Sequence, residues 1–219
     1  MTTLPHRILG ALDRFNAAHP WDHNAHYHRW ILRSLPRRFD RALDVGSGSG
    51  DLARLLATRA REVHAVDSDP VLTARAVAAT PETAPVTFTV ADAPEGLPAG
   101  PYDVLTCVAV LHHLPLGEAL RAFRRRLAPG GTLVVVGCAR ARSVGDHALG
   151  AAAVPLNAAV GWYRNRGRTG QPPLSMTAVT RPPERDFAEI AREARRTLPG
   201  AHLRRRLFWR YTLVWRAEG

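Results

Sequence analysis

The chain has 219 residues, of which 46% are hydrophobic, and this is enough for one α/β domain with a sizeable core. No apolar run reaches the roughly 18 residues of a membrane-spanning helix, and the first residues lack the apolar segment of a signal peptide. The sequence therefore predicts a cytoplasmic protein with no membrane partner.

The formal net charge is +11, and all 30 basic residues are arginines. One interpretation is an electropositive face for nucleic acid or another anionic substrate. The other is a codon bias toward arginine, which the complete absence of lysine supports, because phosphate binding gives no reason to exclude lysine. We therefore expect no nucleic-acid partner.

The cysteines, Cys107 and Cys138, stand in apolar runs without the spacing of a metal site, and we expect buried thiols without a disulfide. The histidines between 23 and 28 have no cysteine or carboxylate that would complete a zinc site. The sequence thus predicts no bound metal ion.

Residues 1–40 precede the first predicted strand and are expected to form two helices. Apolar periodicity predicts the first helix over 7–18, and Pro20 ends it. The second helix is predicted over 22–34, with Asp22 as its N-cap.

This second helix carries an unusual aromatic and histidine face. By helical spacing, the face consists of His23, His26, Tyr27 and Trp30. His28 points elsewhere. The simplest interpretation is a half-buried face that packs on the rest of the domain.

A glycine-rich turn over 46–50 joins a predicted strand, 42–45, to a helix that starts at about residue 51. Its glycines permit positive φ and a close approach of the backbone to a ligand. They are Gly46, Gly48 and Gly50. Asp44, at the end of the strand, can accept a hydrogen bond from a cationic or hydroxyl donor.

Dinucleotide-binding proteins use a related loop, G-x-G-x-x-G/A. Counted from Gly46, the third glycine falls on Asp51, which does not fit. Counted from Gly48, Ala53 fits the relaxed form. The loop alone therefore leaves open a dinucleotide site, an ordinary tight turn and a site for another nucleotide-like ligand.

The spacing of Asp44 and the glycines that follow it resembles motif I of the class I S-adenosylmethionine (SAM)-dependent methyltransferases. The resemblance covers roughly residues 38–218 and is strongest over 41–136. It implies an α/β fold: a doubly wound, seven-stranded, mostly parallel Rossmann-like sheet with a C-terminal antiparallel hairpin. It also implies SAM as the cofactor.

The second predicted strand, 62–67, ends in a run of polar residues, Asp67-Ser68-Asp69. In both rival folds an acid at this place hydrogen-bonds the ribose hydroxyls. Asp67 is the candidate by its position at the end of the strand. Asp69 precedes Pro70 and is expected to cap a helix over 71–79.

The third predicted strand, 86–90, is followed by Ala91-Asp92-Ala93. In the methyltransferase family, the acid after this strand accepts a hydrogen bond from the adenine amino group, and Asp92 matches that position. A dinucleotide enzyme has no need of this third acid, so the methyltransferase interpretation is favoured.

A buried strand is predicted over 102–108, and a Leu-His-His-Leu segment similar to the family's follows it. Val108 stands where enzymes that methylate amino groups of nucleic acids usually carry Asn or Asp, which argues against that chemistry. His112 or His113 is a candidate general base for a hydroxyl acceptor, because histidine titrates near neutral pH. The alternative is a structural pair that caps a turn and shapes the SAM pocket.

The rest of the chain follows the family's order. A helix over 117–127 leads through a Pro-Gly-Gly turn at Pro129 into the fifth strand. A helix over 184–198 and two tightly joined strands, 201–208 and 209–216, complete the predicted fold.

Residues 1–40 are expected to form a helical lid over the domain 41–219, because an N-terminal helix covers the cofactor and acceptor in many small methyltransferases. Tyr27 would then lie near the methionyl end of SAM. His23 or His26 would lie near the acceptor.

An insertion over 138–183 is rich in Gly, Pro, Ala and Arg. Insertions at this place commonly build the acceptor pocket in the family, which makes Trp162 and Tyr163 candidate substrate contacts. A disordered connector is the alternative.

The predicted function is transfer of the SAM methyl group to a hydroxyl, amine or carbon of a small organic molecule. The alternatives are an RNA methyltransferase that uses the arginine-rich surface and a non-catalytic SAM-binding regulatory protein. The sequence leaves the oligomeric state open. The predicted cofactor-binding residues are Tyr27, Asp44, Gly46, Ser47, Gly48, Gly50, Asp67, Ser68, Asp92, Ala93 and Val108.

Overall fold

The computed structural model describes residues 4–176 and 181–219 and contains a seven-stranded sheet in the order β3-β2-β1-β4-β5-β7-β6. The strands are β1 (Phe39–Val45), β2 (Ala60–Asp67), β3 (Val86–Val90), β4 (Tyr102–Val108), β5 (Leu127–Gly137), β6 (His202–Arg206) and β7 (Arg210–Arg216). The first five strands are parallel, and β7 runs antiparallel to both of its neighbours. The predicted fold class, with its closing hairpin, is confirmed.

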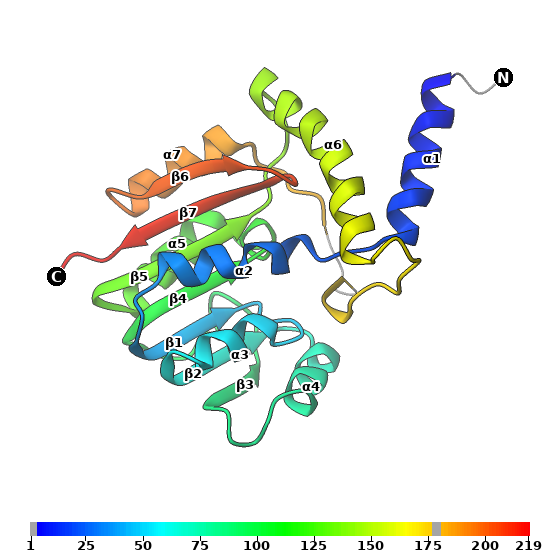
Figure 1. The fold of residues 1–219 in the computed structure, drawn as a ribbon. Coiled ribbons are helices and arrows are strands. Elements are labelled where there is room, and N and C mark those ends of the chain that lie inside the picture. The colour runs from blue at the N-terminus through cyan, green and yellow to red at the C-terminus, as the bar shows by residue number, and fades with distance from the viewer. Residues whose placement is uncertain (1–3, 177–180) are drawn as a thin grey trace.

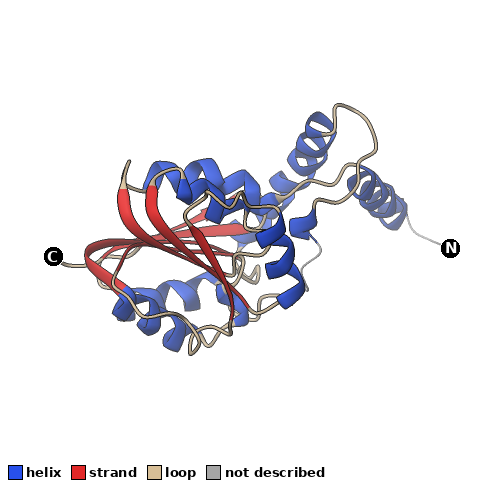
Figure 2. Ribbon diagram, turned by 90° about the horizontal axis from the view of Figure 1, so that it is seen from below, coloured by secondary structure: helices blue, strands red, loops and turns tan. Residues whose placement is uncertain are grey.

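Helices cover both faces of the twisted sheet (Figures 1 and 2). They are α1 (Leu4–Ala18), α2 (His23–Ser34), α3 (Asp51–Ala57), α4 (Pro70–Ala78), α5 (Leu116–Arg126), α6 (Val144–Arg164) and α7 (Phe187–Thr197). Short 3₁₀ turns occupy η1 (Leu111–His113) and η2 (Leu174–Met176). The described residues contain no helix that is long and apolar enough to cross a membrane.

Each face of the sheet has its own apolar core. On one face, Ile31 of α2 and Leu56 of α3 pack against Val104 of β4 and the strands beside it. On the other, α5 and α7 bury apolar residues such as Phe123 and Ile190 against the same central strands. Burial on both faces explains the runs of small and apolar residues in the middle of β1 and β4, Ala42-Leu43 and Val104-Leu105.

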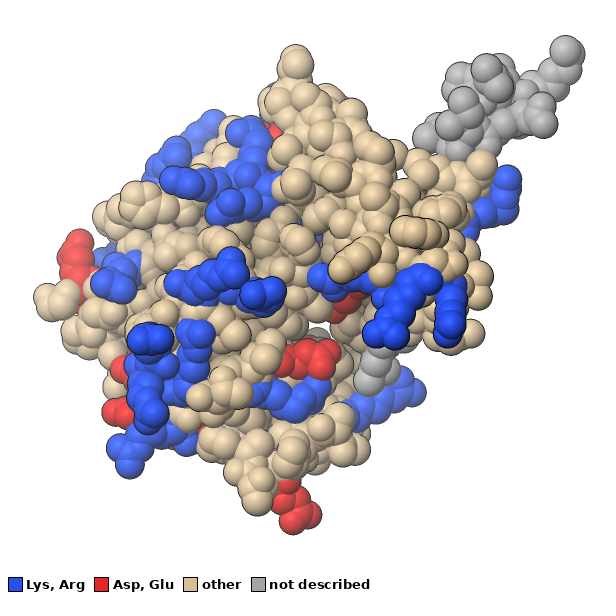
Figure 3. Space-filling view, in the orientation of Figure 1, with Lys and Arg blue, Asp and Glu red and all other residues tan. Residues whose placement is uncertain are grey.

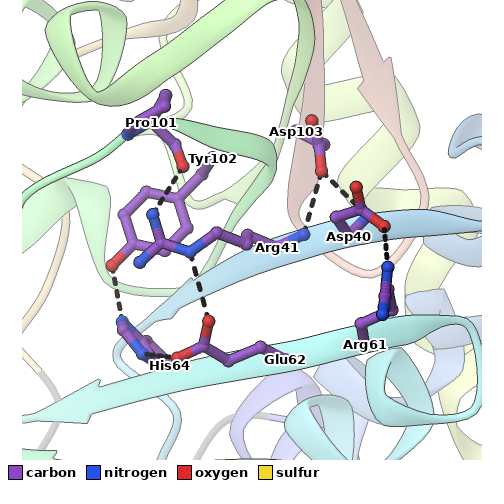
Figure 4. Close-up of polar contacts among 8 residues, drawn as sticks. All are labelled: Asp40, Arg41, Arg61, Glu62, His64, Pro101, Tyr102 and Asp103. Atoms are coloured by element: carbon purple, nitrogen blue, oxygen red, sulfur yellow. Dashed lines mark hydrogen bonds and ion pairs between the residues drawn. The ribbon is translucent and has the colours of Figure 1, made fainter.

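The strand order reverses between β1 and β4, which both begin next to a polar network at their amino ends (Figure 4). One carboxylate oxygen of Asp103 accepts hydrogen bonds from the backbone N–H groups of Asp40 and Arg41, both at 2.9 Å. The Arg41 side chain reaches Glu62 on β2 at 3.2 Å and lies over the ring of Tyr102. These contacts fix the register of the three central strands, and the opposite ends of the strands carry the site.

Local signals placed most elements correctly. Asp22 accepts from the N–H groups of Asn24 and Ala25, and Asp69 caps α4 in the same way, as predicted. Much of the insertion forms the helix α6, which starts at 144 because a capping box begins at Ser143.

The closing hairpin has a longer turn than predicted. The predicted strands met at 208 and 209, whereas the observed ones stop at 206 and resume at 210. Phe208 and Trp209 both have φ of 57°, which no continuous strand accommodates.

The helices α1 and α6 extend together beyond the edge of the sheet (Figure 1). Their base is held by the Asn165 side chain, which donates to the Pro20 carbonyl at 3.0 Å, and by the Gly170 N–H, which donates to the Ala18 carbonyl. Gly161 is required here, because an added Cβ would lie 2.5 Å from the His19 carbonyl oxygen. The first helices and the insertion therefore pack on each other.

Replacing Ile31 with alanine is expected to lower the free energy of unfolding by about 2–5 kcal/mol, because its side chain is completely buried between α2 and the sheet. Urea denaturation followed by circular dichroism measures the change. The control is Arg29→Ala on the exposed side of the same helix, which should shift stability by less than about 0.5 kcal/mol. Equal effects of the two substitutions would contradict the packing of α2 on the sheet.

Candidate functional site

A cavity of about 710 Å³ opens at the carboxyl ends of β1, β2 and β4, where the strand order reverses. This is the usual place for a ligand site in an open α/β sheet. The cavity gathers ten of the residues predicted from the sequence. They are Asp44, Gly46, Ser47, Gly48, Asp67, Ser68, Asp92, Ala93, Val108 and His113.

The glycine loop wraps the bottom of this cavity. Gly46, Gly48 and Gly50 have φ of 73°, 51° and 75°, which confirms the predicted need for glycine. A Cβ on Gly46 would lie 2.0 Å from a methyl group of Val110, whereas Gly48 has open space beside it. Gly50 does not line the cavity and instead packs against Phe88 at the start of α3.

Asp67 holds the glycine loop to the end of β2. Its Oδ2 accepts a hydrogen bond from the Gly48 N–H at 2.7 Å, and its Oδ1 accepts one from the Asp69 N–H at 2.9 Å. The carboxylate also lines the cavity. Its remaining lone pairs are free to accept hydrogen bonds from ligand hydroxyls.

Asp44 is a buried carboxyl group at the end of β1, with only 1% of the residue exposed. Its Oδ1 accepts a hydrogen bond from the Thr106 hydroxyl at 2.7 Å, but its Oδ2 has no partner among the described residues. Burial raises the pKa of Asp44 to about 7; the Thr106 hydrogen bond opposes this shift, and the nearby Asp67 adds to it. A ligand cation would relieve the cost of the ionised form.

These groups fit SAM, which carries a sulfonium and an ammonium cation, two ribose hydroxyls and an adenine amino group. Asp44 offers one buried oxygen that has no partner among the described residues and could accept a hydrogen bond from a cation, and Asp67 and Asp92 line the same cavity. The uncrowded position of Gly48 leaves room for a ligand against the backbone.

The two adjacent histidines have different surroundings. His113 lines the cavity, whereas His112 does not; the two rings are tilted by 39° with their centroids 3.9 Å apart. Burial lowers the pKa of His112 to about 4, and its Nδ1 is buried without a partner among the described residues. Burial also lowers the pKa of His113, and the positive charge of Arg181 adds to the effect. Both rings are therefore neutral at pH 7, and His113 alone of the pair faces the cavity.

The helix α2 lines the same cavity as the glycine loop, but with a different face from the one predicted. Asn24 and His28, one turn apart, line the cavity together with the N-cap Asp22. The sequence pattern had directed His28 elsewhere. The reason is that Tyr27 and Ile31 pack in the core against the sheet. This orientation of α2 places Asn24 and His28 at the cavity.

The predicted contacts of Tyr27, His23 and His26 with ligands are therefore corrected. The Tyr27 hydroxyl donates to the Leu207 carbonyl at 2.7 Å within the core. His23 Nε2 lies 2.7 Å from the Asn157 side-chain oxygen, and His26 is exposed. None of the three lines the cavity.

The insertion reaches the cavity through other residues than those predicted. Trp162 and Tyr163 are 54% and 77% exposed at the end of α6 and do not line the cavity. Ser175 and Arg181, from the segment between α6 and α7, line it instead. No periodicity or motif in the sequence marks these two residues.

Comparisons with known proteins agree with this geometry. Residues 43–135 match a family model described as a methyltransferase domain. An uncharacterized methyltransferase of Mycobacterium tuberculosis (strain H37Rv) is 32% identical over 204 residues, which cover 90% of this chain and 98% of that protein. The trans-aconitate 2-methyltransferase of Streptomyces avermitilis is 38% identical over 105 residues, covering 45% of this chain and 39% of that enzyme.

Solved structures show the same fold. The N-methyltransferase NodS of Bradyrhizobium japonicum, in complex with S-adenosyl-L-homocysteine, aligns with a TM-score of 0.56 at 19% identity over 96% of this chain and 98% of that one. A putative methyltransferase of Haloferax volcanii, in complex with the Trm112 activator, gives a TM-score of 0.61 at 17% identity and covers 96% and 95% of the two chains.

Asp67→Ala is expected to weaken SAM binding by roughly ten- to a hundredfold, because charge-assisted hydrogen bonds to the ribose contribute about 1.5–3 kcal/mol. Titration calorimetry measures the dissociation constant. Asp69→Ala is the comparison: Asp69 also lines the cavity, but its side chain caps α4, so the substitution should cost about 1 kcal/mol of stability with little change in SAM affinity. The reverse pattern would assign the ribose to Asp69.

The raised pKa of Asp44 predicts proton-linked SAM binding. The contribution of Asp44 to stability is fully present below its ordinary pKa of 3.8 and is lost as the pH rises through about 7. A cation held by the ionised carboxylate should therefore displace a proton below pH 7, so that SAM affinity rises with pH by up to about tenfold per unit and then levels off.

Calorimetry in two buffers with different ionisation enthalpies counts the protons released. We expect release at about pH 6 and almost none at about pH 8. Asp44→Asn should abolish the difference between the two pH values and weaken binding. Equal proton release by the wild-type protein at both values would show that Asp44 does not meet the cation.

Proposed function

The chain belongs to the class I SAM-dependent methyltransferases, and we propose that it methylates a small organic molecule. The observation that carries the proposal is the composition of the cavity. Three acids suited to SAM stand on one side, and His28, His113 and Arg181 stand among the other residues that line it. One cavity therefore offers groups for both the cofactor and an acceptor.

When bound, SAM supplies a methyl group on a positively charged sulfur. The transferred carbon leaves this sulfur with the bonding electrons remaining there and forms a new bond with the acceptor, in line with the broken one. The residues of the chain mainly need to align the two reactants, since the sulfonium charge disappears during transfer. Asp44 and Asp67 would hold the cofactor, and α2 would restrict the entry of water above the glycine loop.

His113 is the proposed general base for an acceptor that reacts through a hydroxyl group. It lines the cavity, and its lowered pKa keeps the ring neutral and able to accept a proton at pH 7. The imidazole would take the hydroxyl proton as the carbon–oxygen bond forms. For an acceptor that reacts without losing a proton, the same ring would serve only to position it.

Arg181 favours an acceptor that carries a carboxylate or another anionic group. It is the only arginine among the residues that line the cavity in the described part of the chain. A guanidinium matches a carboxylate in charge and geometry. The partial similarity to a trans-aconitate methyltransferase supports the same class, because that enzyme is named for an acid substrate.

The test is formation of S-adenosyl-L-homocysteine from SAM with a panel of small hydroxy acids, dicarboxylic acids, amines and phenols. For a hydroxyl acceptor, His113→Gln should lower kcat by about 10²–10⁴-fold with a nearly unchanged SAM dissociation constant. His202→Gln, on the exposed side of β6, is the matched control and should leave kcat unchanged. The wild-type acid limb of the rate profile should lie below the ordinary histidine pKa of 6.5.

Tight SAM binding without turnover of any acceptor would contradict the proposal and support a regulatory SAM-binding protein. Turnover of RNA alone would support the RNA methyltransferase instead. A loss of activity in His202→Gln equal to that in His113→Gln would remove the role assigned to His113.

A further inference from the structure

The helix α6 presents a long apolar face to solvent. From 148 to 163, every residue that is exposed is apolar. Four large side chains at or near this face are among the most exposed hydrophobic residues described. They are Val144 at 86%, Leu156 at 42%, Trp162 at 54% and Tyr163 at 77% exposure. Alanines and a proline fill the face between them: Ala148, Ala151, Ala152, Pro155 and Ala159.

This face is not the one that attaches α6 to the protein. The opposite stripe, made of Ala153, Asn157 and Gly161 at four-residue spacing, is buried. The Asn157 side-chain oxygen accepts a hydrogen bond from the Trp21 indole at 3.0 Å, and Ala153 packs in a small cluster with Trp21 and Phe208. Among the described residues, α6 is therefore anchored by the buried stripe and not by the exposed face.

Positive charge follows the aromatic end of this face. Arg164, Arg166 and Arg168 come directly after Trp162 and Tyr163, and all three are exposed. Within the part of the chain that the structure describes, none of them forms an ion pair. The guanidinium of Arg164 lies over the Trp21 ring, 5.1 Å from its centroid. Aromatic rings beside exposed basic side chains such as Arg166 and Arg168 are the usual composition of segments that sit in the headgroup region of a bilayer.

The position of α6 suits contact with a broad surface. It stands out from the domain beside α1, and in the space-filling view the protruding part is drawn almost entirely in the colour of uncharged residues (Figures 1 and 3). Blue basic side chains lie below it on the same side of the molecule. The described chain contains no membrane-spanning helix, so any contact of α6 with a bilayer would be along its surface.

We propose that α6 docks this protein on an anionic lipid surface, with its apolar face in the headgroup region and the arginines at its end against the lipid phosphates. Exposed apolar patches rimmed by polar residues mark interaction sites. The arginines at the end of α6 favour an anionic bilayer as the partner of this face, because each basic residue near such a bilayer strengthens binding by roughly fivefold. A second copy of the chain carries the same net charge of +11 and offers these arginines no acidic face of its own on α6.

The first test measures flotation of the full chain with vesicles of equimolar phosphatidylglycerol and phosphatidylcholine. Binding is expected to these vesicles, to be weak with phosphatidylcholine alone, and to fall as salt is raised. The double variant Leu156→Glu/Tyr163→Glu should bind at least tenfold more weakly. The matched control, Val71→Glu/Val77→Glu, introduces the same charges at exposed apolar positions on α4 and should bind several-fold more tightly than the α6 variant.

The second test addresses the arginines. Arg166→Gln/Arg168→Gln should weaken binding to the anionic vesicles by roughly 25-fold, at about fivefold per arginine. Arg192→Gln/Arg195→Gln removes the same charge from exposed positions on α7 and is the control, expected to have the smaller effect. Circular dichroism and SAM calorimetry on every variant establish that the fold and the cofactor site are intact.

Failure of the wild-type protein to bind anionic vesicles would overturn the proposal. So would equal losses in the α6 and control variants, because the effect would then be one of net charge alone. Sedimentation equilibrium tests the other occupant: a dimer that Leu156→Glu/Tyr163→Glu dissociates would show that a second copy covers α6. None of these measurements depends on methyl transfer, so they test membrane docking independently of the proposed function.

Discussion

The buried carboxyl group of Asp44 is the constraint on which the site depends. It sits at the end of the central strand β1, where the neighbouring strands β2 and β4 exclude water, and one of its oxygens has no partner among the described residues. Burial raises the pKa of this carboxyl group to about 7, so its ionised form is costly without a cation beside it. A positively charged ligand at this place would lower that cost, and the other residues that line the cavity surround the same carboxyl group.

Backbone hydrogen bonds fix the conformation of the loop that follows Asp44. The N–H groups of Gly46 and Ser47 donate to the Val66 carbonyl at 2.7 and 3.0 Å, and that of Gly48 donates to Asp67. The loop after β1 is thus fastened to the end of β2. One set of contacts therefore positions both Asp44 and Asp67 at the cavity, and the Asp67 carboxylate also holds the backbone of the loop.

The sequence was sufficient where the relevant residues are contiguous. The glycine loop and the acids after β2 and β3 each lie at the end of a strand, so alternation and turn residues place them without knowledge of the packing. The face of α2 was predicted wrongly because helical spacing defines several faces and cannot choose among them. Tertiary packing of Tyr27 and Ile31 makes that choice, and it turns His28 toward the cavity. Arg181 was missed because it reaches the cavity from a segment with no pattern of its own.

The exposed face of α6 escaped prediction for a related reason. Its composition is apolar throughout, so the pattern does not distinguish a helix buried on all sides from one that is anchored by a single stripe. The structure separates the two sides through Asn157, whose side-chain oxygen meets both Trp21 and His23. Those residues flank Asp22, the cap of α2 that lines the cavity. The contacts that support α6 and a residue that lines the cavity therefore belong to one short segment, residues 21–23, which links the position of α6 to that of the cavity.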